Sequence, residues 1–121
     1  MDAETYLNSL EPIGWKLGLE RMELLSDELG RPQDRFESVH VVGTNGKSSV
    51  TRMTSALLTA HGRRSGCSVS PHLHRWSERV LIDGEEIGAE AFSSAVETVA
   101  AAAGRVNERL EGDERVTQFE V

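Results

Sequence analysis

A glycine-rich loop with one lysine is the first candidate for chemistry in this chain. The segment HVVGTNGKSSV places two glycines beside Lys47 and follows them with two serines. Glycine lets a backbone turn sharply and approach a ligand closely, and a lysine ammonium there can hold outer phosphate oxygens. A neighbouring hydroxyl suits Mg²⁺. The segment therefore predicts a phosphate site made of Gly43, Thr44, Asn45, Gly46, Lys47, Ser48 and Ser49.

The loop departs from the general P-loop pattern at one position. That pattern is G-x-x-x-x-G-K-[ST], and Val41 stands here in place of its first glycine. The alternative is a plain strand-to-helix turn with an exposed lysine. The phosphate site is favoured because an apolar run precedes the loop and a helical pattern follows it. The free N–H groups and the dipole of that helix would then face an anion.

Two elements must position this loop. The β-branched run SVHVV, residues 38–42, predicts a buried strand that delivers the chain into it. From Ser48 onward the apolar period predicts a helix that ends at Gly62, with Val50, Met53, Leu57 and Ala60 on one face.

The remaining pattern predicts an α/β fold. Helices are expected over residues 2–10 and 19–29 and, as a long amphipathic helix, over 89–110. Short strands are expected at 67–70 and 116–121, and Asp83-Gly84 between two short runs predicts a hairpin. Strands alternating with helices favour a mostly parallel sheet wrapped by helices. The expected core stripe of the long helix is Phe92, Val96, Val99, Ala103, Val106 and Leu110.

Composition limits the classes of function. With 121 residues and a net charge of −7, the chain fits one domain or part of one and is a poor general partner for nucleic acid. Cys67 is the only cysteine, and no secretory signal or membrane span is recognisable, so a cytoplasmic location without a membrane partner is expected. His72 and His74 lack further ligands at zinc spacing, so a zinc site is rejected.

Four segments of the sequence resemble those of a known family. The segment HVVGTNGKSSV is similar to the ATP loop of the Mur ligase superfamily, and most similar to its folate branch, the folylpolyglutamate and dihydrofolate synthases. Three further segments agree in order, namely GLERMELLSDELGRP, SPHLHRWSERVLIDGEEI and QFEV. Ser48 departs from the resemblance, because the folate enzymes usually have glycine there. Cell-wall Mur ligases often have Ser or Thr.

The resemblance implies a fold and an activity. The fold would be a P-loop NTPase-like three-layer sandwich with a mostly parallel sheet. Residues 1–121 would form part of its ATP-binding domain, and the glutamate-binding domain would lie outside the chain. ATP and Mg²⁺ would be required. The enzyme would join L-glutamate to dihydropteroate or to a reduced folate through an acyl phosphate, with Lys47 supplying positive charge for phosphoryl transfer.

The resemblance also implies individual site residues. It assigns Ser70 and Glu120 to the magnesium ion, both at strand ends in the expected sheet. It places dihydropteroate against Trp15, Lys16, Leu17 and Gly18, although Trp15 could equally cover the core. The loop after Ser70 could bring His72 and Arg75 to the substrate.

Other functions stay open on the sequence. A cell-wall Mur ligase would perform the same chemistry on a nucleotide-linked muropeptide, and a non-catalytic P-loop module would bind nucleotide alone. A GTPase-like switch would need a base-reading motif such as N-K-x-D, which is not found in the chain. Small-molecule partners and a monomeric state are expected. The apolar run at the end of the chain suggests the N-terminal piece of a longer protein, which by itself would not complete the reaction.

Overall fold

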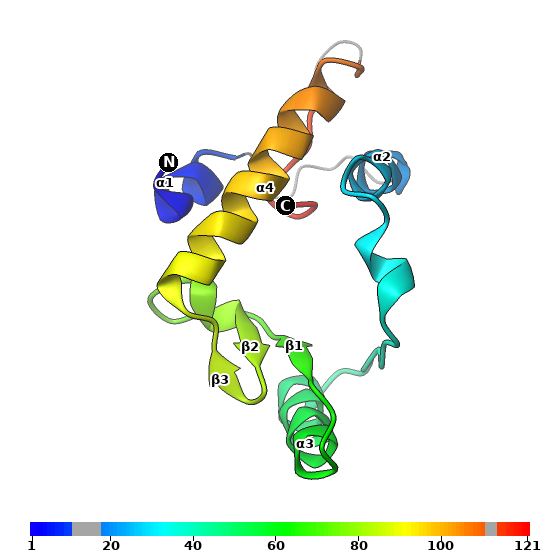
Figure 1. Cartoon of the computed structure of the whole chain (residues 1–121), viewed down its shortest axis with the longest axis vertical. Helices are drawn as coiled ribbons and strands as arrows, with labels where there is room; N and C mark the ends of the chain where they lie inside the picture. The colour runs from blue at the N-terminus through cyan, green and yellow to red at the C-terminus, as the bar shows by residue number, and fades with distance from the viewer. Residues whose placement is uncertain (11–17, 111–113) are drawn as a thin grey trace. The chain divides into compact units, whose positions relative to one another are not determined.

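The computed structural model describes residues 1–10, 18–110 and 114–121, and Figure 1 labels their helices and strands. These residues form two compact units. Unit 1 contains Met1–Glu37 and Ser93–Val121, and unit 2 contains Ser38–Phe92. Trp15, Lys16 and Leu17, which were expected to contact the pterin, lie outside the described residues. Across the described ranges, no helix has the length and apolar character needed to cross a bilayer.

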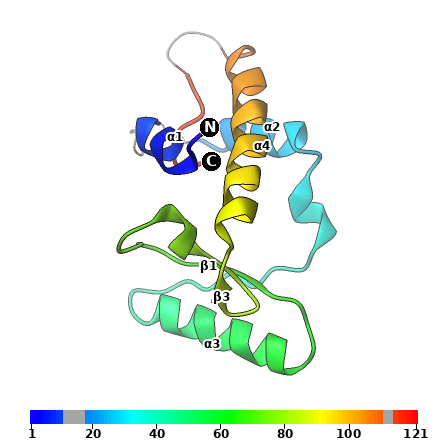
Figure 2. The same ribbon diagram turned by 60° about the vertical axis from the view of Figure 1, so that its left-hand side comes forward.

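Unit 1 is built from helices. It contains α1 (Ala3–Ser9), α2 (Glu20–Glu28), the short 3-10 helix η1 (Pro32–Arg35) and most of α4 (Ala89–Asn107). In Figure 1 α1 and α2 lie on opposite sides of α4, and in the turned view of Figure 2 α2 passes behind α4. The predicted helices are confirmed, within one to three residues at most ends. The buried core unites α2, α4 and the last segment of the chain through Leu25, Ala102, Ala103, Val106 and Val116.

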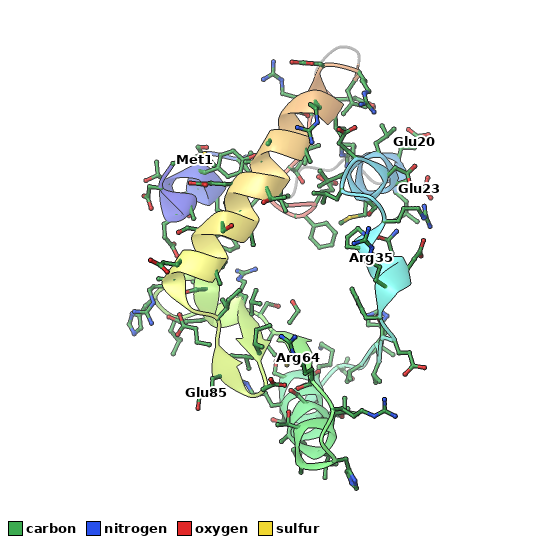
Figure 3. All side chains as sticks on the ribbon, in the orientation of Figure 1. Met1, Glu20, Glu23, Arg35, Arg64 and Glu85 are labelled. Atoms are coloured by element: carbon green, nitrogen blue, oxygen red, sulfur yellow. The ribbon has the colours of Figure 1, made fainter. Side chains whose placement is uncertain are left out.

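Local signals explain where these helices begin and end. Asp2 caps α1, because its carboxylate accepts the amide of Thr5 at 3.1 Å. After α2, Gly30 adopts a φ of +74°, a left-handed conformation that glycine adopts without strain. Glu20 and Glu23 on α2 point away from the core (Figure 3), as the outer face of an amphipathic helix should.

Unit 2 joins one helix to a small sheet. It contains α3 (Lys47–Ala60), β1 (Gly66–Ser68), the 3-10 helix η2 (Trp76–Arg79), β2 (Val80–Ile82) and β3 (Glu85–Glu86). The strand order is β1-β2-β3 with both pairs antiparallel, and Cys67 lies opposite Leu81. The predicted hairpin is confirmed. Its turn has φ of +50° at Asp83 and +89° at Gly84, both in the left-handed region that such turns need.

The predicted strands at 38–42 and 116–121 are wrong for the described structure. Residues 38–42 form no strand, and Val39 and Val42 are 69% and 75% exposed. Residues 116–121 end in a turn. All strands found in the described residues are antiparallel, so the expected mostly parallel sheet is not among them. A strand exists only by pairing, and an apolar β-branched run without a neighbouring strand stays extended and exposed.

The helix after the loop is confirmed, and its apolar face is largely exposed. Val50, Met53 and Leu57 are 46%, 58% and 63% exposed. Instead α3 lies against β1, and it meets Ser65, the residue before β1, through hydroxyl groups. The Ser65 hydroxyl lies 2.7 Å from that of Ser55 and 3.0 Å from that of Thr59. An apolar period shows which residues share a face, whereas burial depends on which neighbour covers that face.

Ser65 connects α3 to the hairpin turn, and its removal should loosen that connection. Its amide donates to the Asp83 carboxylate at 2.8 Å, while its buried hydroxyl meets Ser55 and Thr59. Ser65→Ala is expected to lower the opening free energy of α3, read from amide hydrogen exchange, by about 1–3 kcal/mol. Ser68→Ala, at an exposed serine of the adjoining strand β1, is the control. Equal effects of the two variants would contradict this role for Ser65.

Candidate functional site

The loop before α3 ends in an uncapped helix N-terminus. Residues 44–46 form a bend, α3 begins at Lys47, and the Val50 amide donates to the Gly46 carbonyl at 2.9 Å. The amides of Lys47, Ser48 and Ser49 precede that bond, so none has an acceptor within the helix. Gly46 supplies no side-chain cap, and the first turn holds no acidic residue. These free donors make the start of α3 attractive to an anion.

Two glycines give this loop its shape. Gly43 has φ of +151° and Gly46 has φ of +76°, conformations that L side chains rarely adopt. A Cβ on Gly46 would meet nothing within 4 Å. Glycine is therefore required at Gly46 by the backbone conformation, and the open space beside it leaves room for a ligand.

Lys47 places its charge over the same loop. Its ammonium nitrogen Nζ donates to the Gly43 carbonyl at 2.6 Å, and the residue is exposed. An ammonium group has three N–H donors, so it can hold the loop and still bind an oxygen of a ligand. Thr44, Asn45, Ser48 and Ser49 are exposed around it. The loop thus brings together the predicted phosphate-binding residues, with accessible hydroxyls at Ser48 and Ser49.

The predicted metal ligands are placed differently. Ser70 is exposed in unit 2, whereas Glu120 belongs to unit 1 and its side chain is only 5% exposed. The Glu120 carboxylate accepts the amide and hydroxyl of Thr117 at 2.6 and 2.7 Å, and Arg21 Nε at 3.2 Å. Burial alone would raise the pKa of Glu120, but Thr117 and Arg21 outweigh it and hold that pKa below its ordinary value.

These contacts do not fit a ready magnesium site at Glu120. Three donors already surround its carboxylate, and Arg21 supplies the charge that a metal ion would bring. The described residues also contain no group of three or more His, Cys, Asp or Glu side chains suited to a metal. Glu120 therefore acts here as the buried partner of Arg21, a role that the sequence did not reveal because the two residues are 99 positions apart.

The expected substrate residues lie partly on one loop. Gly18 is exposed in unit 1, and His72 and Arg75 lie in unit 2, on the loop between Ser70 and η2. Arg75 is already paired, since its guanidinium lies 3.1 Å from the Glu86 carboxylate. Glu86 also accepts the hydroxyl of Ser77, and these hydrogen bonds lower the Glu86 pKa. Arg75 therefore braces the loop against β3 in this structure.

Glu78 holds the same loop and was missed in the sequence. Its carboxylate accepts the amides of Leu73, His74 and Arg75 at 2.8, 3.0 and 2.9 Å. The Leu73 amide is the largest cause, with Arg75 and His74, of a Glu78 pKa below the ordinary value. Only one half of a capping box is present, because Glu78 accepts the amide of Arg75, whereas the Arg75 guanidinium has no acceptor to return the bond. The available sequence signal was the position of Glu78, three residues after Arg75, the residue that precedes η2.

The Glu78 contacts predict a pH-dependent loop. A carboxyl with a depressed folded-state pKa stabilises above its unfolded pKa, here near the ordinary 4.5, and loses that contribution as the pH falls through the folded value. The amide resonances of Leu73, His74 and Arg75 should therefore shift together below about pH 4.5. Glu78→Gln should shift them at neutral pH.

Glu85→Gln is the control for Glu78, because Glu85 is exposed and points away from the sheet (Figure 3). Loop resonances that ignore both the Glu78 substitution and the acid titration would show that these amides are held by something else.

Comparison with known proteins gives consistent matches to one group of enzymes. The chain is 36% identical over 115 residues to the folylpolyglutamate synthase of Lacticaseibacillus casei, covering 95% of this chain and 27% of that one. It is 52% identical over 69 residues to the dihydrofolate synthase/folylpolyglutamate synthase of Mycobacterium tuberculosis, covering 57% of this chain and 14% of that one. This chain is similar to the folylpolyglutamate and dihydrofolate synthases.

Solved structures of these synthases have the same fold over nearly the whole chain. The Mycobacterium tuberculosis folylpolyglutamate synthase complexed with ADP has a TM-score of 0.83 at 36% identity, covering 97% of this chain and 26% of that one. An FPGS–AMPPCP–folate complex has a TM-score of 0.87 at 35% identity, covering 98% and 28%. No protein-family profile matches the chain. The chain covers 27% of the first curated relative named above and 14% of the second, so it spans about a quarter of their length or less.

Proposed function

We propose that this chain forms part of the ATP-binding region of a carboxylate–amine ligase that adds L-glutamate to dihydropteroate, to the glutamate tail of a reduced folate, or to both. The observation that carries the proposal is the uncapped start of α3 beneath Lys47 and the two glycines with positive φ. Solved relatives complexed with ADP or AMPPCP support a nucleotide as its ligand.

The loop is suited to phosphoryl transfer. A substrate carboxylate oxygen would attack the γ-phosphorus of ATP, ADP would leave, and an acyl phosphate would form. The amine of glutamate would then attack the acyl carbon, and phosphate would depart as the amide forms. Both steps gather negative charge on phosphate oxygens, which needs fixed donors and cations more than a protein nucleophile. Lys47 and the free amides of Lys47, Ser48 and Ser49 supply them.

Magnesium is proposed at the nucleotide end of the site. The exposed hydroxyls of Ser48 and Ser49 follow Lys47 directly, and either one could bind an ion held mainly by the nucleotide phosphates. Ser70 is proposed as a further ligand because its hydroxyl is accessible. The Glu120 carboxylate is already paired with Arg21, so no step of the reaction is routed through it.

The pterin end of the substrate is proposed to meet the loop after Ser70, and Gly18 is a further proposed contact on the sequence resemblance. The supporting observation is that His72 and Arg75 lie on a loop whose backbone is held by Glu78. The matching FPGS–AMPPCP–folate complex supports a folate-type ligand. Trp15, Lys16 and Leu17 are part of the same proposal on the sequence resemblance alone.

The fold of the complete domain is also a proposal. The exposed side of α3, with Val50, Met53 and Leu57, and the exposed valines at 39 and 42 are suited to a further sheet layer. We expect that layer to turn this α/β chain into part of a P-loop-type sandwich, with the glutamate-binding domain formed by other residues. A monomer is expected.

A coupled ADP-release assay on the full protein product of the gene tests this function. Dihydropteroate and tetrahydrofolate are compared, each with and without L-glutamate. ADP release that requires both glutamate and one of these pterins is expected. Absence of glutamate-dependent release with either acceptor, in protein that binds ATP, would overturn the ligase and leave a nucleotide-binding module.

A further inference from the structure

Three side chains form a compact cluster beside the loop that follows Ser70. Arg79 Nε donates to His72 Nδ1 at 2.8 Å, and the centre of the Arg79 guanidinium lies 4.2 Å from the centroid of the Trp76 ring. The rings of His72 and Trp76 are 4.6 Å apart between centroids and tilted by 53°. All three residues belong to unit 2. None of these contacts is explained by the phosphate loop.

The contact with Arg79 determines where the His72 proton lies. A guanidinium has only N–H donors and no acceptor, so its partner atom must offer a lone pair. His72 Nδ1 is that atom. In a neutral imidazole with an acceptor at Nδ1, the proton lies on Nε2. His72 is therefore held as the Nε2–H tautomer.

Trp76 keeps Arg79 in place for this role. A guanidinium over an indole face is stabilised by the ring quadrupole, and the same ring packs against His72. The imidazole is thus fixed by a hydrogen bond at one edge and by an aromatic contact with Trp76. Its remaining polar atom, Nε2, has no hydrogen-bond partner among the residues that the structure describes.

The backbone next to His72 is held as well. Glu78 binds the amides of Leu73, His74 and Arg75, and Arg75 is braced by Glu86. A donor that is fixed before the ligand arrives loses little freedom on binding. His72 should therefore bind an acceptor atom at a lower entropic cost than a flexible surface histidine would.

We propose that Arg79 is a positioning residue that holds His72 as an Nε2–H donor for an acceptor oxygen of the pterin-containing substrate. The proposal rests on the proposed ligase function for the identity of the ligand. His72 then acts by donating a hydrogen bond, and its Nδ1 is available neither as a metal ligand nor as a base. Arg79 serves the site without touching the substrate.

Nitrogen NMR of the chain with ¹⁵N-labelled histidine tests the tautomer without any activity. At neutral pH, His72 should show an unprotonated Nδ1 and a protonated Nε2. In Arg79→Ala the His72 signals should move towards a mixture of tautomers, while those of His40 and His61 stay unchanged. Arg52→Ala, an exposed arginine on α3, is the control. A protonated Nδ1 in the unsubstituted chain, or no change in a folded Arg79→Ala, would overturn the proposal.

Kinetics on the full protein product separate this proposal from the ligase function. Loss of one neutral hydrogen bond should raise KM for the pterin substrate about 2- to 10-fold in Arg79→Ala, with KM for ATP unchanged. His72→Ala should do the same, and the double variant should add little. If the pterin KM were unchanged in both variants and turnover were intact, the proposed recognition of the pterin by His72 would be overturned. The ligase function would stand. Unsubstituted protein without glutamate-dependent turnover would instead reject the ligase function.

Discussion

Lys47→Ala is expected to lower glutamate-dependent ADP release by the full protein product about 10²- to 10³-fold, the usual effect of removing one donor from developing negative charge. Lys47 contributes a full charge at the mouth of the loop, where its Nζ also closes onto the Gly43 carbonyl. Its removal takes away both the cation and that loop contact. The coupled assay at saturating ATP measures the change in kcat, and its dependence on ATP measures the change in KM.

Two further variants identify the cause of the Lys47 effect. Lys47→Arg keeps the charge but changes its shape, so partial activity is expected. Arg52→Ala removes another exposed cation of the same helix and should leave the rate unchanged. If Arg52→Ala and Lys47→Ala were equally slow, the effect would reflect the general charge of α3, and the phosphate role of Lys47 would be wrong.

Glu120→Ala is expected to lower the free energy of unfolding of unit 1 by about 3–5 kcal/mol, because it removes the carboxylate that pairs with a buried guanidinium. Arg21 and Glu120 have side-chain exposures of only 8% and 5% and lie 3.2 Å apart. The substitution also removes the acceptor of the Thr117 amide and hydroxyl. Amide exchange in α2 and α4, or urea unfolding followed by circular dichroism, measures the loss.

The pH dependence of the same pair has a defined sign. The pKa of Glu120 is lowered in the folded chain, so its contribution to stability is present above the ordinary value of 4.5 and disappears as the pH falls through the folded pKa.

The exposed Glu23 serves as the matched control in Glu23→Ala. If Glu120 served only to bind metal, Glu120→Ala would leave the free energy of unfolding of the metal-free chain unchanged. That result would contradict the pairing of Glu120 with Arg21.

The helices could be predicted from the sequence because their signals are local. The stripe through Val96, Ala103 and Val106 is buried as expected, and Asp83-Gly84 gives the predicted turn. The runs at 38–42 and 116–121 read as strands, yet a strand is determined by partners far along the chain. The same limit applies to α3, whose apolar stripe was recognisable although the structure leaves it exposed.

The candidate site divides in the same way. The glycine-rich turn and the helix start after it could be predicted because glycines, lysine and a helical pattern follow one another within a few residues. The role of Arg79 depends on the 3-10 helix η2, which brings its side chain back to His72. The spacing of residues in the sequence does not predict that contact. Glu120 was predicted from the resemblance as a magnesium ligand, whereas the structure pairs it with Arg21, which is 99 positions away and beyond any local pattern.

The central claim is that a nucleotide phosphate binds at the start of α3. Amide NMR of the ¹⁵N-labelled chain, titrated with AMPPCP and magnesium, tests it most directly. The largest shifts are predicted at the amides of Gly46, Lys47, Ser48 and Ser49, saturating with nucleotide and lost in Lys47→Ala. Saturable binding that left these four amides unmoved, or no binding by the chain and by the full protein product, would contradict it.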